Sequence, residues 1–221
     1  MFDLTALYAQ ALEGPGLFIV VEGLDGAGKS IQTTRLIDRM LLYGHLGGVN
    51  DIHNMRQPTR AQYGQKIRQF AGASEERKPL VEFTLFLADR MEQAEEVRAA
   101  VRRGEVVVMD RCYHTSVAYQ SVTGELDPWE IFHSNRIVFP KPDLLIMIDI
   151  DPGVAMDRLD RRERKKEVFE QEAFFVKARE TYLELTRREE GALINGDQTI
   201  DEVEEDIWNA FLEFLANRFP R

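Results

Sequence analysis

The chain has 221 residues, of which 44% are apolar, and a formal net charge of −10 at pH 7. That length and composition fit a globular protein with a substantial core and exclude a disordered chain. The acidic balance excludes non-specific binding of nucleic acid through the overall field, so an anionic ligand must be held by local positive charge.

The chain begins with a predicted helical extension and a strand–loop–helix unit. Residues 1–14 fit a short amphipathic helix, without the basic start of a secretory signal. Leu17 to Glu22 is apolar and β-branched, which indicates a buried strand. Helical spacing of apolar residues then runs from Lys29 to Gly44. No apolar run reaches membrane-spanning length, so we expect no membrane partner.

The loop between that strand and helix carries a phosphate-binding pattern. Gly23, Gly28, Lys29 and Ser30 match G-x-x-x-x-G-K-[ST] in the context that the pattern requires. Glycines let backbone N–H groups crowd around phosphate oxygens, Lys29 would reach the β- and γ-phosphates of ATP, and Ser30 would bind Mg²⁺. The expected ATP-binding residues are Gly23, Asp25, Gly26, Ala27, Gly28, Lys29, Ser30 and Ile31.

Asp25 is an unusual member of this loop. A carboxylate beside phosphate oxygens is repelled by them unless it faces another group, such as a sugar hydroxyl. The alternative is that Asp25 stabilises the loop through an Asx turn. The sequence lacks the N-K-x-D type signal by which GTPases read their base.

Predicted strands and helices alternate through the rest of the chain. We expect strands at residues 49–55, 106–110, 143–150 and 192–195. We expect helices at residues 63–70, 79–103, 114–119, 128–138, 152–162, 171–188 and 200–217. This order predicts an α/β protein of three αβα layers with a five-stranded parallel sheet and helices on both faces, in a single domain over residues 1–221.

A second anion site is expected at the edge of the sheet that carries the phosphate loop. Arg56 follows the second strand, and Asp110 and Arg111 end the third. Phe86 and Arg90 are one helical turn apart, so they share a face of the long helix. Arginine suits a phosphate, an aromatic ring suits a base, and Asp110 could contact Mg²⁺ through water.

Two of these residues have plainer alternatives. Arg90 could form a surface ion pair with Asp89 or Glu92, and Asp110 could be an ordinary strand-end cap.

A basic stretch lies between the fourth strand's helix and the long helix that follows. We expect residues 158–169 to form a lid whose arginines close over transferring phosphates and exclude water, with Arg162 and Arg164 as catalytic candidates. The alternative is a solvated helix face. The basic residues are Arg158, Arg161, Arg162, Arg164, Lys165 and Lys166.

Taken in order, several segments strongly resemble thymidylate (dTMP) kinases, over nearly the whole chain from Leu17. These segments are FIVVEGLDGAGKSIQTTRL, RQP, LFLADRMEQ, VVVMDRCYHTSVAYQ, PKPDLLIMIDID and FEQEAFFVKARETYLEL. The resemblance implies the reaction ATP + dTMP → ADP + dTDP, with Mg²⁺ and a homodimer. In this family a loop without arginine after the acidic residue goes with arginines in the lid, and both hold here.

The resemblance also implies roles for individual residues. Lys29 and Ser30 would bind ATP phosphates and Mg²⁺, with Asp110 positioning metal or phosphates. Asp25 would take the deoxyribose 3′-hydroxyl. The acceptor nucleotide would be bound by Asp25, Arg56, Phe86, Arg90, Arg111 and Tyr119, with Phe86 on thymine and Arg56 and Arg111 on the phosphate. Lys29, Asp110, Arg111, Arg162 and Arg164 would be the catalytic residues.

Three positions depart from the family pattern. Gln57 stands where a glutamate is usual, which weakens a metal or water role there. Cys112 stands where tyrosine or histidine is usual, and we expect it to be a small buried residue. Val168 stands where the lid usually has an arginine. These departures concern the identity of the acceptor more than the kinase chemistry.

Three rival functions stay open: a kinase for another nucleotide or nucleoside, a non-catalytic ATP-binding protein of the same fold, and an ATPase or GTPase switch. An internal disulfide is impossible because Cys112 is the only cysteine, which fits a cytoplasmic location.

Overall fold

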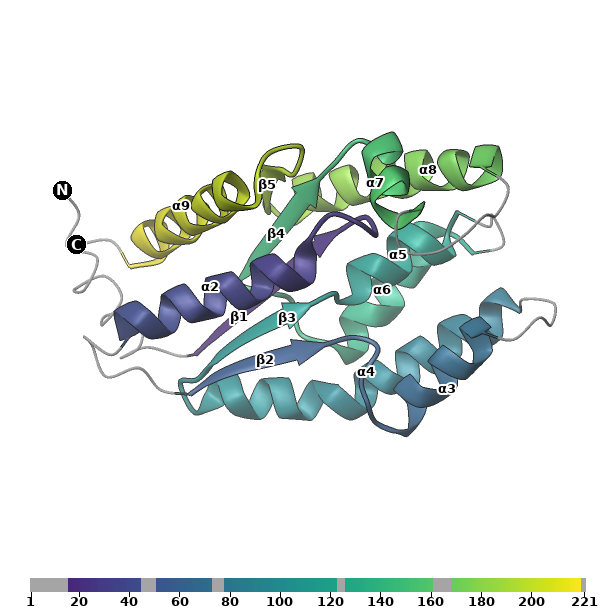
Figure 1. Ribbon diagram of the computed structural model, residues 1–221. Helices are drawn as coiled ribbons and strands as arrows, with labels where there is room; N and C mark the ends of the chain where they lie inside the picture. Colours follow the sequence, from purple (N-terminus) through teal and green to yellow (C-terminus); the bar gives the residue numbers. More distant parts are fainter. Residues whose placement is uncertain (1–15, 45–50, 73–77, 123–125, 161–167, 220–221) are drawn as a thin grey trace.

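The computed structural model describes residues 16–44, 51–72, 78–122, 126–160 and 168–219 (Figure 1). Within these ranges five parallel strands form one sheet in the order β2-β3-β1-β4-β5. They are β1 (Leu17–Gly23), β2 (Ile52–Arg56), β3 (Val106–Asp110), β4 (Leu144–Asp149) and β5 (Ala192–Asn195). The predicted five-stranded parallel sheet is confirmed.

Helices cover both faces of this sheet, which confirms the three-layer α/β prediction. The helices α2 and α9 lie on one face, and α4, α5 and α8 lie on the other (Figure 1). The bounds of the described helices are α2 (Lys29–Gly44), α3 (Gln62–Gly72), α4 (Pro79–Arg102), α5 (Tyr113–Gln120), α6 (Pro128–Val138), α7 (Pro152–Asp160), α8 (Val168–Arg188) and α9 (Ile200–Arg218).

Strand β1 shows why the sheet has two covered faces. All seven of its residues are buried. Phe18 and Val20 belong to the core cluster that includes Val97 of α4, whereas Ile19 and Val21 belong to the cluster of α2 and α9. Because successive strand side chains point to opposite faces, a continuous apolar run is what a doubly covered strand requires.

The expected element bounds were wrong by a few residues at several ends. Strand β2 begins at Ile52 and continues to Arg56, so Asp51 is not part of it, while residues 49 and 50 of the predicted strand lie outside the described residues. It lies at the edge of the sheet, where Asn54 is exposed and polar residues cost little. Helix α8 begins at Val168 rather than Gln171.

Some predictions lie outside the described residues. The N-terminal helix over residues 1–14 is one. Most of the lid is another: α7 ends at Asp160 and α8 begins at Val168, so residues 161–167 fall between them. No helix among the described residues is long and apolar enough to cross a membrane.

The register of the sheet places the candidate site residues together. Asp110, at the end of β3, is opposite Arg56 of β2 on one side and Val21 of β1 on the other. Because all strands are parallel, the loop after β1 opens at this same edge.

Candidate functional site

The loop after β1 needs glycine for steric reasons. Gly23 has φ +148° and Gly26 has φ +89°, values that residues with a Cβ rarely adopt. A Cβ on Gly23 would lie 2.4 Å from the carbonyl oxygen of Ile148, and one on Gly26 would lie 2.9 Å from that of Ala155. The loop therefore presses its backbone against β4 and α7. It then opens α2, where the Ile31 N–H donates to the Gly28 carbonyl at 3.1 Å.

Lys29 lies across this loop. Its Nζ donates to the carbonyls of Gly23 at 2.9 Å and Leu24 at 2.6 Å, and the residue is 5% exposed. Burial and the nearby Arg111 lower the pKa of Lys29 to about 7, against the opposing effect of Asp25. Phosphate oxygens would be stronger partners for this amine than neutral carbonyls are.

Ser30, in the first turn of α2, contacts Asp110 at the end of β3. Ser30 Oγ donates to Asp110 Oδ2 at 2.5 Å, and Arg56 Nε lies 3.7 Å from the same oxygen. Asp110 Oδ1 is buried and finds no hydrogen-bond partner among the described residues. Hydroxyl and carboxylate oxygens are ligands that Mg²⁺ prefers, so the pair predicted to bind metal is together and has free acceptor capacity.

Asp25 and Arg111 form a close ion pair between the loop and the turn after β3. Burial raises the pKa of Asp25, but Arg111 and Lys29 outweigh it and hold that pKa below its usual value. The Asp25 N–H donates to the Tyr119 hydroxyl at 2.9 Å. The loop carboxylate is therefore neutralised by Arg111, a partner that the sequence reasoning did not assign to it.

Arg90 is buried, so the surface ion pair considered from the sequence is wrong. The residue is 1% exposed, and Asp89 instead accepts hydrogen bonds from the Thr59 N–H and hydroxyl. Burial lowers the pKa of Arg90 to about 10. The Arg90 guanidinium lies 5.4 Å from the centroid of the Phe86 ring, so the two residues do share a face of α4.

Among the residues that the structure describes, the hydrogen-bond partners of Arg90 are all neutral. Its Nε donates to Gln57 Oε1 at 2.9 Å, its Nη1 to Asn135 Oδ1 at 3.0 Å, and its Nη2 to Ser116 Oγ at 2.6 Å. Gln57 in turn donates to Gln93 at 3.1 Å. Gln57 therefore orients Arg90 and does not face the phosphate loop. The replacement of the family's usual glutamate by Gln57 consequently changes the surroundings of Arg90.

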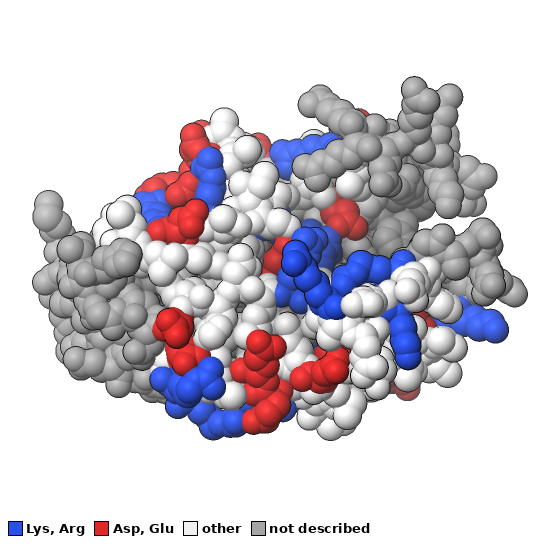
Figure 2. Space-filling model, turned by 60° about the horizontal axis from the view of Figure 1, so that its bottom comes forward, with Lys and Arg blue, Asp and Glu red and all other residues white. Residues whose placement is uncertain are grey.

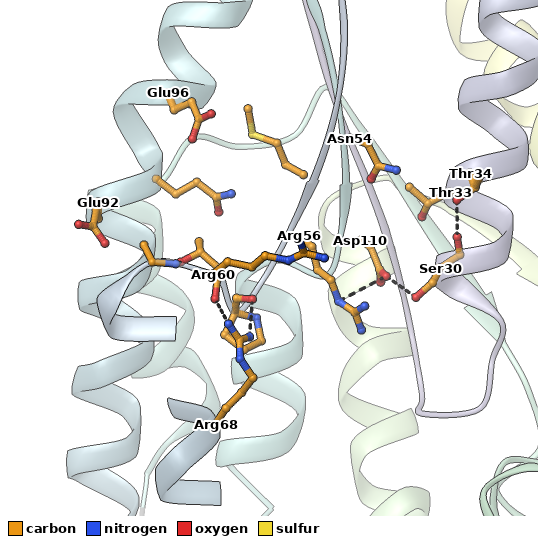
Figure 3. Close-up of a pocket in the computed structure, with 15 residues that line it drawn as sticks. Ser30, Thr33, Thr34, Asn54, Arg56, Arg60, Arg68, Glu92, Glu96 and Asp110 are labelled. Carbon is orange, nitrogen blue, oxygen red and sulfur yellow. Dashed lines mark hydrogen bonds and ion pairs between the residues drawn. The ribbon is translucent and has the colours of Figure 1, made fainter. Parts of the chain in front are cut away.

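A groove of about 1210 Å³ opens beside Ser30 and Asp110 and runs across β2 between α2 and α4. Figure 3 shows Arg56 and Arg60 extending into it, with Glu92 and Glu96 of α4 on its far side. Basic side chains gather near the middle of the face in Figure 2, although the chain as a whole is acidic. The sequence reasoning missed Arg60, because nothing in its local pattern separates it from other surface arginines.

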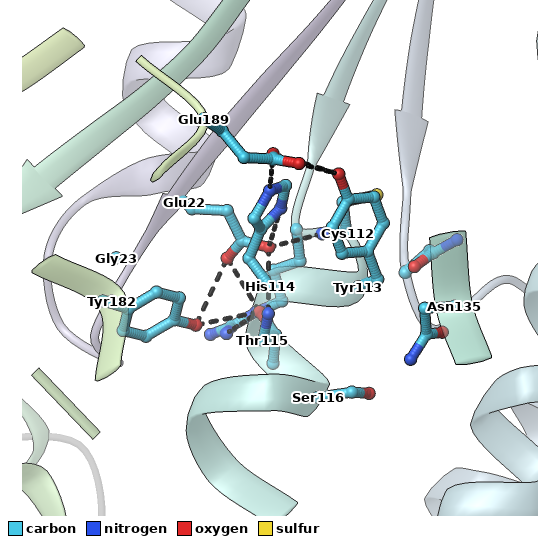
Figure 4. Close-up of polar contacts among 12 residues, drawn as sticks. Glu22, Gly23, Cys112, Tyr113, His114, Thr115, Ser116, Asn135, Tyr182 and Glu189 are labelled. Atoms are coloured by element: carbon cyan, nitrogen blue, oxygen red, sulfur yellow. Dashed lines mark hydrogen bonds and ion pairs between the residues drawn. The ribbon is translucent and has the colours of Figure 1, made fainter. Parts of the chain in front are cut away.

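The sequence reasoning also missed a buried polar cluster behind the turn after β3 (Figure 4). His114 Nε2 lies 2.7 Å from Glu189 Oε2, and its Nδ1 lies 3.7 Å from Glu22 Oε1. Burial alone would lower the pKa of His114, but its contacts with Cys112, Glu189 and Glu22 raise it well above its usual value. Cys112 is buried, as predicted.

Of the basic residues in the predicted lid, only Arg158 lies among the described residues. Arg162 and Arg164 lie outside the described residues. Arg158, in the last turn of α7, donates to the carbonyls of Gly26 at 3.2 Å and Gly196 at 3.3 Å. The described start of the predicted lid thus contacts the phosphate loop.

Comparisons with known proteins find relatives over most of the chain. The family model described as "Thymidylate kinase" matches residues 21–207. A probable thymidylate kinase of Archaeoglobus fulgidus is 33% identical over 201 residues, covering 90% of this chain and 96% of the relative. A thymidylate kinase of Fervidobacterium nodosum is 32% identical, covering 90% and 100%. One of Vibrio parahaemolyticus is 32% identical, covering 91% and 98%.

Proposed function

This chain belongs to the thymidylate kinase family, and from that premise we propose that it transfers the γ-phosphate of ATP to dTMP, giving ADP and dTDP. The observation that carries the proposal is the group of three cations near Asp25 and Asp110: Lys29 in the loop, Arg56 at the end of β2 and Arg111 directly after β3. Such an arrangement can bring two mutually repelling phosphates close together.

On the ATP side, the loop from Gly23 to Ile31 cradles the phosphates. Its backbone N–H groups and the start of α2 supply positive potential, and Lys29 exchanges its carbonyl partners for phosphate oxygens. The nucleotide-binding set is the one expected from the sequence: Gly23, Asp25, Gly26, Ala27, Gly28, Lys29, Ser30 and Ile31.

Ser30 and Asp110 would hold Mg²⁺, which when bound supplies charge neutralisation to the phosphates. Asp110 Oδ1, for which the described part of the chain provides no hydrogen-bond partner, supports this assignment. In the described part of the chain no group of three or more His, Cys, Asp and Glu side chains could hold a metal alone. Nucleotide oxygens and water would complete the coordination, as is usual for Mg²⁺.

On the acceptor side, Arg56 and Arg111 bind the dTMP phosphate. Asp25 orients Arg111 and, with Tyr119, faces the sugar. Phe86 stacks on the base and Arg90 contacts its edge. The closeness of Phe86 to Arg90 and the bond between Asp25 and Tyr119 support this division.

Lys29, Asp110 and Arg111 carry the transfer. Arg162 and Arg164 of the lid join them on closure, and the contact of Arg158 with Gly26 supports a lid that reaches the loop.

We propose a single kinase domain that acts as a cytoplasmic homodimer. The exposed apolar side chains of Leu80, Met91 and Ile137 on α4 and α6 support a partner-binding face, and sedimentation would test it.

The test is ADP release with ATP, Mg²⁺ and a panel of dTMP, dUMP, dCMP and dGMP. We expect release to require an acceptor and to be fastest with dTMP. A faster rate with another acceptor would reassign the substrate. Release without any acceptor, or a preference for GTP, would favour the hydrolase alternative, and ATP binding without turnover would favour the non-catalytic one.

A further inference from the structure

Glu22, the residue before Gly23 in β1, holds a carboxylate that is completely buried. Its Oε1 accepts the Cys112 N–H at 2.7 Å and the Thr115 N–H at 3.1 Å. Its Oε2 accepts the Thr115 hydroxyl at 2.8 Å and lies 3.2 Å from the Tyr182 hydroxyl (Figure 4). One side chain therefore gathers three donors from the turn after β3 and the first turn of α5, and the Tyr182 hydroxyl of α8, which is also 3.0 Å from the Thr115 hydroxyl, lies beside them.

These hydrogen bonds cap the N-terminus of helix α5. Cys112 is the N-cap residue of α5 and its side chain makes no capping bond. The first amides of a helix lack partners within it, and a nearby Ser, Thr, Asp or Asn usually supplies one. Here the acceptor is Glu22, some ninety residues earlier in the chain. Glu22 thus fastens the first turn of α5 to the strand that leads into the phosphate loop.

Arg111 lies in the stretch that Glu22 fastens. Its φ is +70°, a left-handed conformation that is unfavourable for a residue with a side chain. Its N–H donates to Val21 O at 3.1 Å, and its Nη1 lies 3.4 Å from the Thr115 hydroxyl that Glu22 accepts. Glu22 therefore holds Cys112 and Thr115, which follow Arg111 in the chain. Val21, the residue before Glu22, holds the backbone N–H of Arg111 itself.

The charges around Glu22 support an ionised carboxylate. Burial raises the pKa of Glu22, but His114, Arg111 and the Cys112 N–H outweigh it and hold that pKa below its usual value. His114 also contacts Glu189, so the cluster contains cations that balance both carboxylates. A charged acceptor forms stronger hydrogen bonds than a neutral one, which makes the anchor stiff.

We propose that Glu22 is a positioning residue for phosphoryl transfer: it holds Arg111 at a fixed place relative to the phosphate loop. The part of this inference that concerns the acceptor rests on the proposed function, because Arg111 is there assigned to the acceptor phosphate. The anchoring of the turn does not depend on that assignment.

Glu22→Gln tests the proposal, because glutamine keeps the shape and one acceptor oxygen but removes the charge. We expect kcat/KM for dTMP to fall by roughly 10 to 100-fold, the scale of a small misplacement of a substrate-binding group. The KM for dTMP should rise and the KM for ATP should stay unchanged. If the KM for ATP rises as much as that for dTMP, or neither changes, the proposal is overturned.

Asp143→Asn is the matched control. Asp143 accepts the Phe18 N–H at 2.9 Å and pairs with Arg218, so it anchors the other end of β1 in a similar way. Its loss should leave both KM values unchanged. An increase in the KM for dTMP equal to that of Glu22→Gln would mean that general loosening of β1 is responsible, and would overturn the specific role of Glu22.

Hydrogen exchange at single amides gives a readout that does not need activity. In Glu22→Gln the amide of Cys112 should exchange at least about tenfold faster, because its charged acceptor is gone, while those of Val107 and Met109 stay protected. The amide of Thr115 should change less, because it also donates to the Cys112 carbonyl at 3.2 Å. Unchanged exchange at Cys112 would overturn the anchoring itself. If the wild-type protein has no turnover with dTMP, the proposed function fails, and the exchange result still decides whether Glu22 anchors the turn.

Discussion

The phosphate loop and the pocket around Arg90 hold their positive charge in different ways. Beside the loop, Arg111 forms an ion pair with Asp25, and the carboxylates of Asp25, Glu22 and Asp110 lie near Lys29, whose direct hydrogen bonds are to carbonyls. Positive charge is therefore balanced there by nearby negative charge. Around Arg90 the hydrogen-bond acceptors are amide, hydroxyl and carbonyl oxygens, so a buried cation is stabilised by dipoles.

The difference matters for function. A cation paired with a carboxylate in a loop can change partners when a phosphate arrives, which suits binding of highly charged groups. A cation fixed by four neutral acceptors is held in one orientation, which suits contact with the uncharged edge of a base. We therefore expect changes in the loop to affect the rate of transfer most, and changes in the Arg90 pocket to have smaller effects.

The largest effect is expected from Lys29→Ala. Loss of the cation that we propose to contact the transferring phosphate should lower kcat/KM by at least ~10³-fold, as loss of one transition-state contact does. Steady-state kinetics with ATP and dTMP would measure it. The control is Lys177→Ala, which removes an exposed lysine of α8 and should leave the rate unchanged. Near-normal turnover of Lys29→Ala would contradict the loop's assignment.

Arg111→Ala should lower kcat/KM for dTMP by roughly 10² to 10³-fold and leave the ATP site able to bind. The structure adds a complication, because this change also leaves the Asp25 carboxylate without its partner. The double variant Arg111→Ala with Asp25→Asn removes that charge, so its ATP affinity should match the wild type in titration calorimetry. Equal loss of ATP and dTMP binding in the double variant would refute the division of roles.

The third expected effect is a pH dependence of ATP binding. Lys29 has a pKa of about 7 in the protein without nucleotide, since burial disfavours its charge. Phosphates favour the charged amine and raise that pKa, so binding takes up a proton above pH 7. The Kd for ATP should then rise by up to about tenfold per pH unit from pH 7 to 9, and show no contribution from Lys29 below pH 7. Calorimetry in buffers of different ionisation heat would detect the proton. Lys29→Arg, which stays charged over this pH range, should lack the dependence. A Kd for ATP that does not change with pH in the wild-type protein would contradict the lowered pKa of Lys29.

The smallest effect tests the neutral pocket. Gln57→Glu places a carboxylate against Arg90 Nε, at a position where the acceptor is now a neutral amide. The amide of Gln93 can rotate to donate to it, so no bond is lost. We expect the free energy of unfolding at pH 7 to rise by about 1 kcal/mol, the difference between a charged and a neutral acceptor. Urea denaturation would measure it. Gln57→Met, which removes the acceptor, should lower stability instead, and a loss of stability in Gln57→Glu would contradict the inferred charge environment.

The two regions also differ in how far the sequence predicts them. The loop is contiguous, so Gly23, Gly28, Lys29 and Ser30 could be assigned from their spacing and from the strand and helix on either side. Strand β3 and helix α6 were predicted at their observed bounds because apolar runs and Pro128 mark them clearly. The start of α8 was not, since it was expected at Gln171 and lies at Val168.

The Arg90 pocket and the anchor at Glu22 are assembled from residues far apart in the chain. Gln57, Arg90 and Asn135 come from three different segments, and nothing local in the sequence indicates that they meet. Glu22 ends the strand predicted from Leu17, and its role depends on a helix that begins at Tyr113. Partners of this kind are set by tertiary packing, so periodicity and motif spacing carry no signal for them.

The central claim is that one edge of the sheet holds two phosphate-bearing molecules end to end. A compound that joins adenosine and thymidine through a chain of phosphates tests it directly by titration calorimetry. We predict that one molecule binds per chain, and that ATP and dTMP each compete with it. Competition by only one of the two nucleotides, or binding of two molecules per chain, would contradict the claim.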